Sequence, residues 1–508
     1  MSGKKFYLTT PIFYPNGSLH LGHAYTSVIA DIISNYKKSK GYEVYFHTGS
    51  DDHGEKIEKT SSSLAIKPQK LVDQNVLLFQ GLWKELGINY DIFYRTSFAL
   101  HKKKVQKFFT KLLKQGDIYL DKYRGSYCVT CEDYIKDSLN NKAQTCPVCC
   151  SSTKILEEKA YFFKVSKYQQ QLLNHYQNNP DFLIPTNAKK ELFTNFLKDN
   201  VRDLCITRSD ISWGIQVPNE PQMIIYVWFD ALCNYLTSEI GEKMFDDDNT
   251  EIIHLVGKEI SRFHAIYWPT ILLSLKKRLP NKIIAHGWLI NSQGKMSKSK
   301  GNVIDPLQLL KKYPKDLLRL YFIAKVNFLQ DGIFSEELLK NLYRDFYINN
   351  LGNLCFRTCK MLELYNNSVI PKFKTSENIE LNEYYQNCLL TIKEYQKKFD
   401  NYQLTQAYQE IIHLLDSSNK LIQKIEPWNL FKEKKQELLK LTLNYLINGI
   451  RIIAYLLFPI APSTSQVVFA NFGWNYEDCN WVSISDFGNL SGKKISKIEK
   501  HLFTPLPA

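Results

Sequence analysis

The chain has 508 residues, of which 44% are hydrophobic and 23% are charged, and this ordinary globular composition excludes a disordered or fibrous protein. At roughly 100–200 residues per domain, we expect about three or four domains. Lys and Arg (65) outnumber Asp and Glu (51), which gives a net charge of +14 and favours a polyanionic partner such as nucleic acid. The codon bias of an AT-rich genome would also enrich Lys, so charge alone leaves both interpretations open.

The sequence predicts a soluble, cytoplasmic protein with no membrane contact. Its first residues, MSGKKFYLTTP, lack the apolar region of a signal peptide. The longest apolar stretch, 443–461, contains Asn448 and Arg451 and is typical of a buried helix. Eleven cysteines are too few for a disulfide scaffold of this length, and two CxxC pairs indicate a metal site in a reducing compartment.

The opening residues predict a strand–loop–helix–strand unit. Residues 5–10 favour a short strand that ends at Pro11, and a loop follows at 14–18. Apolar residues have helical spacing over 21–36, and 43–48 favours a second strand. This order is the unit of a parallel nucleotide-binding sheet.

The remaining chain predicts an interrupted α/β domain followed by helices. Helices are expected at 68–86 and 98–115, before an insertion at about 117–225. Strand patterns return at 223–229, 251–257 and 282–290. From about residue 335 the pattern is helical, with long helices expected at 335–365, 381–398, 404–424 and 433–458.

A pair of histidines, in His20-Leu21-Gly22-His23, lies where the opening loop becomes a helix. A helix N-terminus offers free N–H groups and a partial positive charge, so phosphates bind there. The two imidazoles share one face of the first turn, and each can donate a hydrogen bond to a phosphate oxygen. Gly22 leaves room for a base or ribose. Two surface histidines at a helix start would give the same pattern.

A lysine-rich segment, KMSKSKG at 295–301, follows the strand expected at 282–290. Gly294 and Gly301 flank it as flexible joints. Lysines on a mobile loop can close over a triphosphate and stabilise the charge of the departing pyrophosphate. A solvated lysine-rich turn is the alternative, and in isolation it is the more common one.

Four cysteines have the spacing of a zinc site. Cys128 and Cys131 form one CxxC pair, and Cys146 and Cys149 form another after fourteen intervening residues. Two such knuckles close a tetrahedral thiolate site with no open position, so we expect one structural Zn²⁺. Cys150 adjoins the second pair and is an alternative ligand.

In this order, the HxGH and KMSKS segments resemble the two signatures of class I aminoacyl-tRNA synthetases. Five further segments narrow the resemblance to the methionyl-tRNA synthetase family: PIFYPNG (11–17), TGSDDHG (48–54), YVWFDALCNY (226–235), GKEISRFHAIYWP (257–269) and HGW (286–288). The resemblance spans the whole chain. It implies an α/β fold, with a Rossmann-type parallel-sheet catalytic domain, a zinc-knuckle insertion and an all-α anticodon-binding helix bundle.

The resemblance also implies domain boundaries and a reaction. The expected parts are the first half of the catalytic domain (1–116), the insertion (117–225), the second catalytic half (226–280), a KMSKS-loop and stem-contact region (281–340) and the anticodon-binding domain (341–508). Methionine would react with ATP to give methionyl-adenylate and pyrophosphate, and methionine would then pass to tRNA(Met). Mg²⁺ would accompany ATP.

The site residues carry over by position. The implied catalytic residues are His20, His23, Lys295 and Lys298. The implied ATP contacts add Gly22, Glu259, His286, Gly287, Met296, Ser297 and Ser299. The implied methionine site consists of Ile12, Tyr14, Asp51, Trp228, Ala231, Leu232, Tyr235 and His264. Asp51 suits this role because an ammonium group in a closed pocket needs a carboxylate partner, and the aromatic side chains suit a thioether.

The helical C-terminal part is expected to bind the anticodon. Asn353 and Arg357 are four residues apart on one expected helix, and Trp428 can stack on an unpaired base. Core packing is the alternative for Trp428. Because the chain ends soon after these helices, without the further dimerising domain of some relatives, we expect a monomer.

Two other classes of function remain open from the sequence. One is a class I synthetase for cysteine or a branched amino acid, although the insertion of about 110 residues leaves no room for an editing domain. The other is a zinc-containing RNA-binding protein without catalysis, although both signature motifs and Asp51 are intact.

Overall fold

The computed structural model describes residues 3–17, 19–129, 133–134, 145–146, 150–198, 201–225, 227–291, 294–295, 303–495 and 501–506. The chain forms two compact units. The first unit comprises residues 1–30, 42–84 and 88–287, and the second comprises 31–41, 85–87 and 288–508. Helix α1 (Leu21–Ser39) contributes its first half to the first unit and its second half to the second.

A six-stranded, wholly parallel sheet forms the centre of the first unit. Its order is β3-β2-β1-β12-β13-β7. The strands are β1 (Lys5–Phe13), β2 (Glu43–Ser50), β3 (Ile92–Arg95), β7 (Leu183–Ile184), β12 (Thr250–Gly257) and β13 (Lys282–His286). Strand order reverses between β1 and β12, and ligands bind beyond the carboxyl ends of the strands at such a switch point. His20 follows the carboxyl end of β1 by seven residues.

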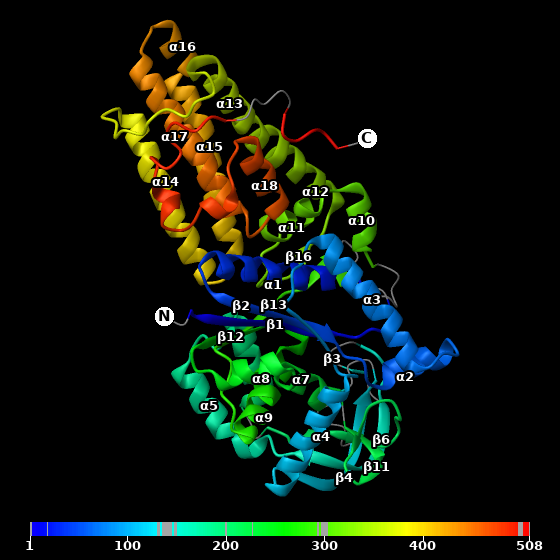
Figure 1. Ribbon diagram of the computed structural model, residues 1–508. Helices are drawn as coiled ribbons and strands as arrows, with labels where there is room; N and C mark the ends of the chain where they lie inside the picture. The colour runs from blue at the N-terminus through cyan, green and yellow to red at the C-terminus, as the bar shows by residue number, and fades with distance from the viewer. Residues whose placement is uncertain are drawn as a thin grey trace. The chain divides into compact units, whose positions relative to one another are not determined.

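Helices cover this sheet because its strands are apolar on both faces, as in the fully buried Ile252, Ile253, Leu255 and Val256 of β12. Figure 1 shows α7, α8 and α9 together on one side of β1 and β2. The helices of the unit outside the insertion, besides α1, are α2 (Glu55–Ser63), α3 (Pro68–Leu86, its last residues in the second unit), α4 (Ala99–Lys114), α7 (Val227–Thr237), α8 (Glu239–Asp246) and α9 (Trp268–Leu275).

The insertion adds two antiparallel sheets to the first unit. The larger has the order β5-β4-β6-β8, in which β4 (Ile118–Cys128) pairs with β6 (Lys154–Phe163) along its length. The smaller has the order β10-β11-β9. The remaining elements are β5 (Asp133–Tyr134), α5 (Gln169–Asn178), α6 (Thr186–Leu192), β8 (Leu204–Cys205), β9 (Thr207–Arg208), β10 (Ile215–Val217) and β11 (Glu220–Ile225).

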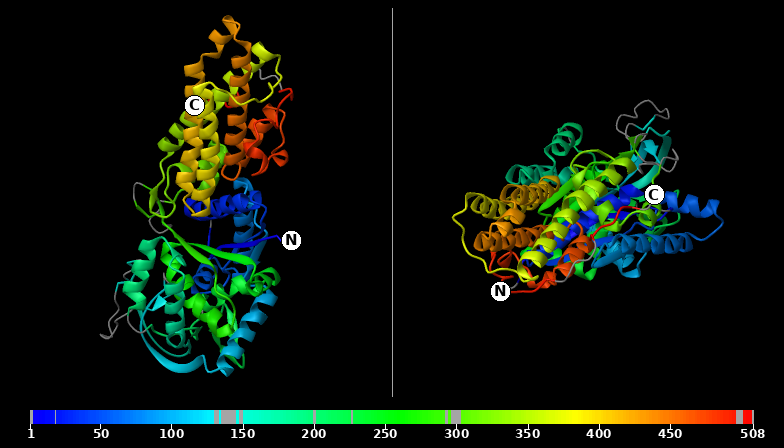
Figure 2. Two further views of the ribbon diagram at one scale, coloured as in Figure 1. Left: turned by 90° about the vertical axis from the view of Figure 1, so that its left-hand side faces the viewer. Right: turned by 90° about the horizontal axis from the view of Figure 1, so that it is seen from above.

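The second unit is mainly helical. Its three long helices, α14 (Ile379–Asp400), α15 (Leu404–Ile425) and α17 (Gln436–Leu457), pack side by side (Figure 2). The shorter elements are β14 (Leu289–Asn291), β15 (Gly294–Lys295), α10 (Pro306–Lys312), α11 (Lys315–Ala324), β16 (Gly332–Ile333), α12 (Glu336–Leu342), α13 (Asn353–Asn366), α16 (Pro427–Lys432) and α18 (Pro462–Asn471). Inside the unit, Arg319 bonds Asp31 at 2.7 Å, and both side chains are fully buried.

The fold class expected from the sequence is confirmed for the parallel sheet and for the helical C-terminal region, whereas three expected strands differ. The first strand was expected to end at Pro11, but β1 continues to Phe13 because a register shift between Thr9 and Ile12 accommodates the proline. The strand expected at 223–229 ends at Ile225, and the helix α7 follows. The strand expected at 282–290 is two strands, β13 and β14.

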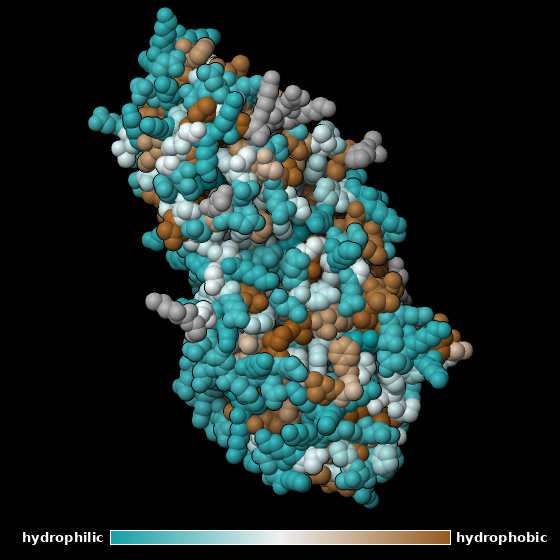
Figure 3. Space-filling model, in the orientation of Figure 1, coloured by the Kyte–Doolittle hydropathy of each residue, from teal (hydrophilic) through white to brown (hydrophobic). Residues whose placement is uncertain are grey.

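The face of the molecule in Figure 3 is mostly hydrophilic, with scattered apolar patches. Among the residues that the structure describes, no helix is both long and apolar enough to cross a membrane. The apolar helix α17 is instead buried over most of its length inside the second unit.

Candidate active site

His20 and His23 lie together at the start of α1, directly after the carboxyl end of β1. Their ring centroids are 3.9 Å apart. The Nδ1 atom of His23 accepts a hydrogen bond from the backbone N–H of His20 (3.1 Å), and the Nδ1 atom of His20 accepts one from the N–H of Gly22 (3.0 Å). Since each Nδ1 accepts, each neutral ring carries its proton on Nε2. Both histidines therefore have an Nε2–H group to donate to an anion.

Gly22 allows this arrangement. A Cβ atom at this position would lie 2.8 Å from Cε1 of His20, closer than real Cβ contacts. The glycine thus makes room for the His20 ring, and not only for a nucleotide as the sequence suggested. The His23 ring also packs edge-on against Phe13, the last residue of β1, with centroids 5.4 Å apart.

His286, at the end of β13, is buried and has partners at both ring nitrogens. Its Nδ1–H donates to the carbonyl of Gly287 (2.8 Å), so its Nε2 accepts from the Thr26 hydroxyl on α1 (2.8 Å). Burial lowers the pKa of His286 and keeps the ring neutral. Glu259 is exposed, and its carboxylate lies so close to Gly257 that a Cβ at Gly257 would meet Oε2 at 2.5 Å.

Helix α7 places four of the expected methionine-site residues on one face. Trp228, Ala231, Leu232 and Tyr235 have the spacing i, i+3, i+4 and i+7. A strand at 223–229 would have put Trp228 on a different element from the others. The helix therefore groups residues that the sequence assigned to one site only through the family resemblance.

Tyr235 connects this face to His264 and Asp51. Nδ1 of His264 donates to the carbonyl of Ile260 (3.1 Å), so its Nε2 accepts from the Tyr235 hydroxyl at 2.8 Å. Burial lowers the pKa of His264 to about 4, so the ring is neutral at pH 7. Burial and, secondarily, the negative charge of Asp51 raise the pKa of Tyr235. Asp51 follows β2, is buried, and donates its backbone N–H to Phe13 O (3.0 Å).

Two further aromatic residues, Phe263 and Tyr14, lie beside the expected methionine-site residues of α7. Trp228 stacks on Phe263 with ring centroids 3.6 Å apart and planes within 5°. Tyr14, after β1, packs with Ile57 and has the Lys56 ammonium 4.9 Å from its ring centroid. Ile12 lies in β1 opposite Gly49 of β2. Phe263 was not singled out from the sequence, although it lies within the 257–269 segment.

A buried carboxylate behind α7 was also missed. Asp230 bonds Nδ1 of His53 and Nε2 of His101, each at 2.6 Å, and all three side chains are buried. Burial alone would raise the pKa of Asp230, but its interactions with His53 and His101, hydrogen bonds among them, lower it overall. His53 belongs to the 48–54 segment and Asp230 to the 226–235 segment, so the two segments meet here. Only a knowledge of tertiary contacts would have found this group.

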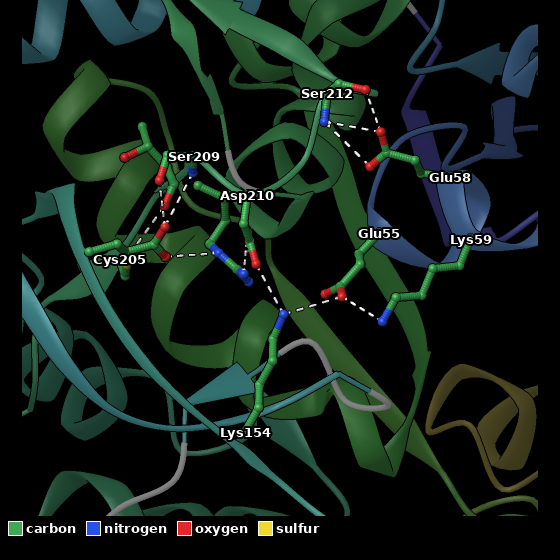
Figure 4. Close-up of polar contacts among 11 residues, drawn as sticks. Glu55, Glu58, Lys59, Lys154, Cys205, Ser209, Asp210 and Ser212 are labelled. Carbon is green, nitrogen blue, oxygen red and sulfur yellow. Dashed lines mark hydrogen bonds and ion pairs between the residues drawn. The ribbon is translucent and has the colours of Figure 1, made fainter. Parts of the chain in front are cut away.

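Ion pairs also connect the insertion to helix α2 (Figure 4). The Lys154 ammonium bonds Asp210 (3.0 Å) and Glu55 (3.3 Å), and Glu55 also pairs with Lys59 (2.7 Å). Glu55 begins α2 immediately after Gly54, whose φ of +109° favours glycine. The segment that carries Asp51 is therefore followed by a helix tied to the insertion.

Several expected site residues lie wholly or partly outside the described part of the chain. Residues 296–299 of the KMSKS segment are outside it, and only the backbone of Lys295, in β15, is described. Cys131 and Cys149 are also outside it. Cys128 and Cys146 are described and buried. Among the described residues, no group of three or more His, Cys, Asp or Glu side chains has the arrangement of a metal site.

The expected anticodon residues lie in the second unit. Asn353 and Arg357 are half-buried in the first two turns of α13, and Trp428 is half-buried in α16. Helix α16 contacts the other end of α13, where Phe431 stacks on Tyr365 with centroids 4.6 Å apart. Tyr365 is roughly 12 Å along the helix from Arg357 at 1.5 Å per residue. Helices α13 and α16, which carry the three expected residues, therefore pack against each other.

Comparison with known protein families shows the family to which this chain belongs. The profile described as tRNA synthetases class I (M) matches residues 6–154 and 142–359, and the one described as anticodon binding domain of methionyl tRNA ligase matches 373–492. The chain belongs to the methionine-specific class I tRNA synthetases. Its activity is methionine–tRNA ligation, in which methionine is activated with ATP and then transferred to tRNA.

Individual relatives agree with this family. The methionine–tRNA ligase of Caldanaerobacter subterraneus subsp. tengcongensis is 41% identical over 98% of this chain and 78% of its own length. That of Ureaplasma parvum is 39% identical over 97% of this chain and 96% of its own. The structure of Mycobacterium tuberculosis methionyl-tRNA synthetase in complex with methionyl-adenylate superposes with a TM-score of 0.90 at 31% identity, covering 98% of this chain and 99% of that one.

Proposed function

We propose that methionine binds along the α7 face, with its ammonium on Asp51 and its thioether among the aromatic side chains. The observation that carries this proposal is the electrostatic connection of the buried Asp51 to Tyr235, which is hydrogen-bonded to the neutral His264. An ammonium group that enters a closed pocket is stabilised by a carboxylate, and the buried Asp51 supplies one for methionine. A neutral, largely aromatic lining suits a thioether, because sulfur–aromatic contacts stabilise it by roughly 0.3–1.5 kcal/mol each.

Other parts of the site would hold ATP. The Nε2–H groups of His20 and His23 and the N-terminus of α1 are donors suited to phosphate oxygens. His286 fixes Thr26 near the start of α1, which supports a role beside the nucleotide. Glu259 and Gly287 are proposed contacts from the same sheet edge, and Lys295 and Lys298 are proposed to stabilise pyrophosphate. Mg²⁺ would accompany ATP as part of the substrate.

In the first step, a methionine carboxylate oxygen attacks the α-phosphorus of ATP, and the bond to pyrophosphate breaks. In the second, a hydroxyl oxygen of the terminal tRNA ribose attacks the methionyl carbonyl, and AMP leaves with its electron pair. The protein positions the reactants and stabilises developing charge. The Nε2–H groups of His20 and His23 and the N-terminus of α1 supply this stabilisation at the phosphate end.

A structural zinc site in the insertion fits the described residues. Cys128 ends β4, and Cys146 lies in a turn where its N–H donates to Ser151 O (2.8 Å) and its carbonyl accepts from the N–H of Cys150 (2.9 Å). Both thiols are buried, and thiolates are the ligands that Zn²⁺ prefers. We propose that these two cysteines, with Cys131 and Cys149, hold one ion that fixes the turn.

The helical unit is proposed to bind the anticodon of tRNA(Met). Support comes from the half-exposed positions of Asn353, Arg357 and Trp428 and from the family match over 373–492. We further propose that the protein is a cytoplasmic monomer. Light scattering on the purified chain would test the second point, because a monomer has a mass of 59.4 kDa.

ATP–pyrophosphate exchange with Asp51→Asn tests the methionine site. The variant keeps the shape of the side chain but loses its charge, so we expect the KM for methionine to rise by at least tenfold while the KM for ATP stays within about twofold. Asp73→Asn, at a half-exposed carboxylate, is the control. A normal methionine KM in Asp51→Asn would refute the assignment. Exchange with cysteine and leucine, and a zinc determination, should accompany the assay.

A further inference from the structure

Tyr127 of the insertion lies directly behind two aromatic residues of the proposed methionine site. It is the second-last residue of β4, and its side chain is 1% exposed. Tyr14 and Trp228 both pack against it, and Val129 completes the cluster. Tyr14 and Trp228 come from different parts of the first unit, since Tyr14 follows β1 and Trp228 lies on α7. Tyr127 is therefore a common support for both.

The insertion holds the Tyr127 ring through cations. The guanidinium carbon of Arg208 is 4.3 Å from the ring centroid, and Nζ of Lys154 is 5.6 Å from it. Arg208 is almost completely buried and pairs with Glu158 (2.8 Å) and with Asp210. A guanidinium paired in this way cannot rotate away, so it restricts the ring that it covers.

The same ion pairs connect Tyr127 to the catalytic core. Lys154 bonds both Asp210 and Glu55, as Figure 4 shows, and Glu55 begins the helix that follows the Asp51 segment. Lys154 is also the strand partner of Tyr127 in the β4–β6 pair. The Tyr127 ring is thus fixed by its strand and by the two cations beside it. One of these cations, Lys154, is in turn bonded to Glu55 in the helix after Asp51.

We propose that Tyr127 is a positioning residue for methionine, which keeps Tyr14 and Trp228 in the conformation that binds the amino acid. This inference rests on the proposed methionine site. The ring acts through its rigid shape and its contacts, because an aromatic side chain has few rotamers and fills the space between its neighbours. The phenol oxygen has no part in this role. In this role Tyr127 acts only through Tyr14 and Trp228, not by contact with ATP or the reacting atoms.

Tyr127→Leu and Tyr127→Phe separate this role from others. Tyr127→Leu removes the aromatic contacts that hold Tyr14 and Trp228 in place. We therefore expect it to raise the KM for methionine by about tenfold in pyrophosphate exchange. The KM for ATP and the kcat should stay within about twofold. Tyr127→Phe keeps the ring and should restore the wild-type KM. Tyr127→Met fills the space with a flexible chain and serves as the second variant if Tyr127→Leu does not fold.

Tyr161→Leu is the matched control for general loosening of the insertion. Tyr161 is 7% exposed on the neighbouring strand β6, and its ring packs against Phe109 of α4. Its methionine KM should remain normal. Equal increases in Tyr161→Leu and Tyr127→Leu, or an increase in Tyr127→Phe as large as in Tyr127→Leu, would overturn the inference.

Trp228→Leu separates a failure of the proposed methionine site from a failure of the positioning role of Tyr127. If it leaves the methionine KM unchanged, the proposed methionine site is wrong, and this inference falls with it. If Trp228→Leu raises the methionine KM and Tyr127→Leu does not, the site stands and only the positioning role of Tyr127 is refuted.

Discussion

The buried carboxylate of Asp230 offers a direct test of how the catalytic unit is held together. His101 bonds Asp230 through Nε2 and the Thr237 hydroxyl oxygen through Nδ1, each at 2.6 Å. The Thr237 hydroxyl also lies 3.2 Å from the carbonyl oxygen of Asn234. His101 is therefore hydrogen-bonded at both ring nitrogens, and its Nε2–H donates to the Asp230 carboxylate.

Asp230→Asn preserves the shape of the side chain but removes its charge. An amide accepts from His101 only if its NH₂ group donates to Nδ1 of His53, which forces the His53 proton onto Nε2. That atom is buried and has no hydrogen-bond partner among the described residues. Leaving a buried polar group unsatisfied costs about 1–3 kcal/mol. At roughly 2 °C per kcal/mol for a large domain, the Tm of this unit should fall by about 2–6 °C.

Thermal unfolding followed by circular dichroism measures this effect. Asp246→Asn, which removes a half-exposed partner of Lys277, is the control and should change the Tm by no more than about 1–2 °C. If Asp230→Asn unfolds at the same Tm as the wild type, the two histidines do not depend on the Asp230 carboxylate as described.

Three further predictions concern pH, the lysine loop and the anticodon. Burial lowers the pKa of both His47 and His264 to about 4, so between pH 6.5 and 4 the unfolded chain binds protons that the folded chain does not. The unfolding free energy should therefore be unaffected by these groups above pH 6.5 and fall by on the order of 3 kcal/mol per histidine toward pH 4. His264→Gln should show a smaller loss of Tm between pH 7 and 4.5 than the wild type. Lys298→Ala should slow pyrophosphate exchange by on the order of 10²–10³ without changing the Tm, whereas Lys311→Ala, on the exposed side of α10, should not. Trp428→Ala should raise the KM for tRNA in charging by about tenfold, the value of one lost base stack, and leave exchange unchanged.

Each of these predictions has an outcome that contradicts it. Parallel pH profiles of the Tm for His264→Gln and the wild type would mean that the ring is already charged in the folded state. Near-normal exchange in Lys298→Ala would remove the loop from the mechanism. An equal loss of charging and exchange in Trp428→Ala would assign Trp428 to packing rather than to tRNA.

Much of the fold was predictable because its signals are local. The apolar spacing over 21–36 gave α1, and the segments 43–48 and 251–257 gave β2 and β12, because burial on one face or on both leaves a periodic record in the sequence. The 223–229 segment failed because MIIYVWF is apolar throughout, and such a run does not distinguish a buried strand from a buried helix. The chain in fact changes from β11 to α7 within it.

The candidate site was predictable as a list of residues rather than as an arrangement. The motifs at His20, Gly22 and His23 and the family resemblance gave candidate nucleotide and methionine residues by position. They did not reveal that the ring of His20 occupies the space that Gly22 leaves, or that Phe263 stacks on Trp228. Contacts of this kind depend on rotamers and on packing, and neither is encoded by residue spacing.

By itself, the sequence determined the family, the order of the elements and the chemistry available to them, because motif spacing and hydrophobic period are properties of short windows. Only the tertiary structure decided which buried groups meet. His53 and Asp230 are 177 residues apart, and Tyr127 reaches Tyr14 and Trp228 from an insertion between the two halves of the sheet. Such partners are chosen by close packing and by the need of each buried polar group for a hydrogen bond, and both conditions arise only when the chain has folded.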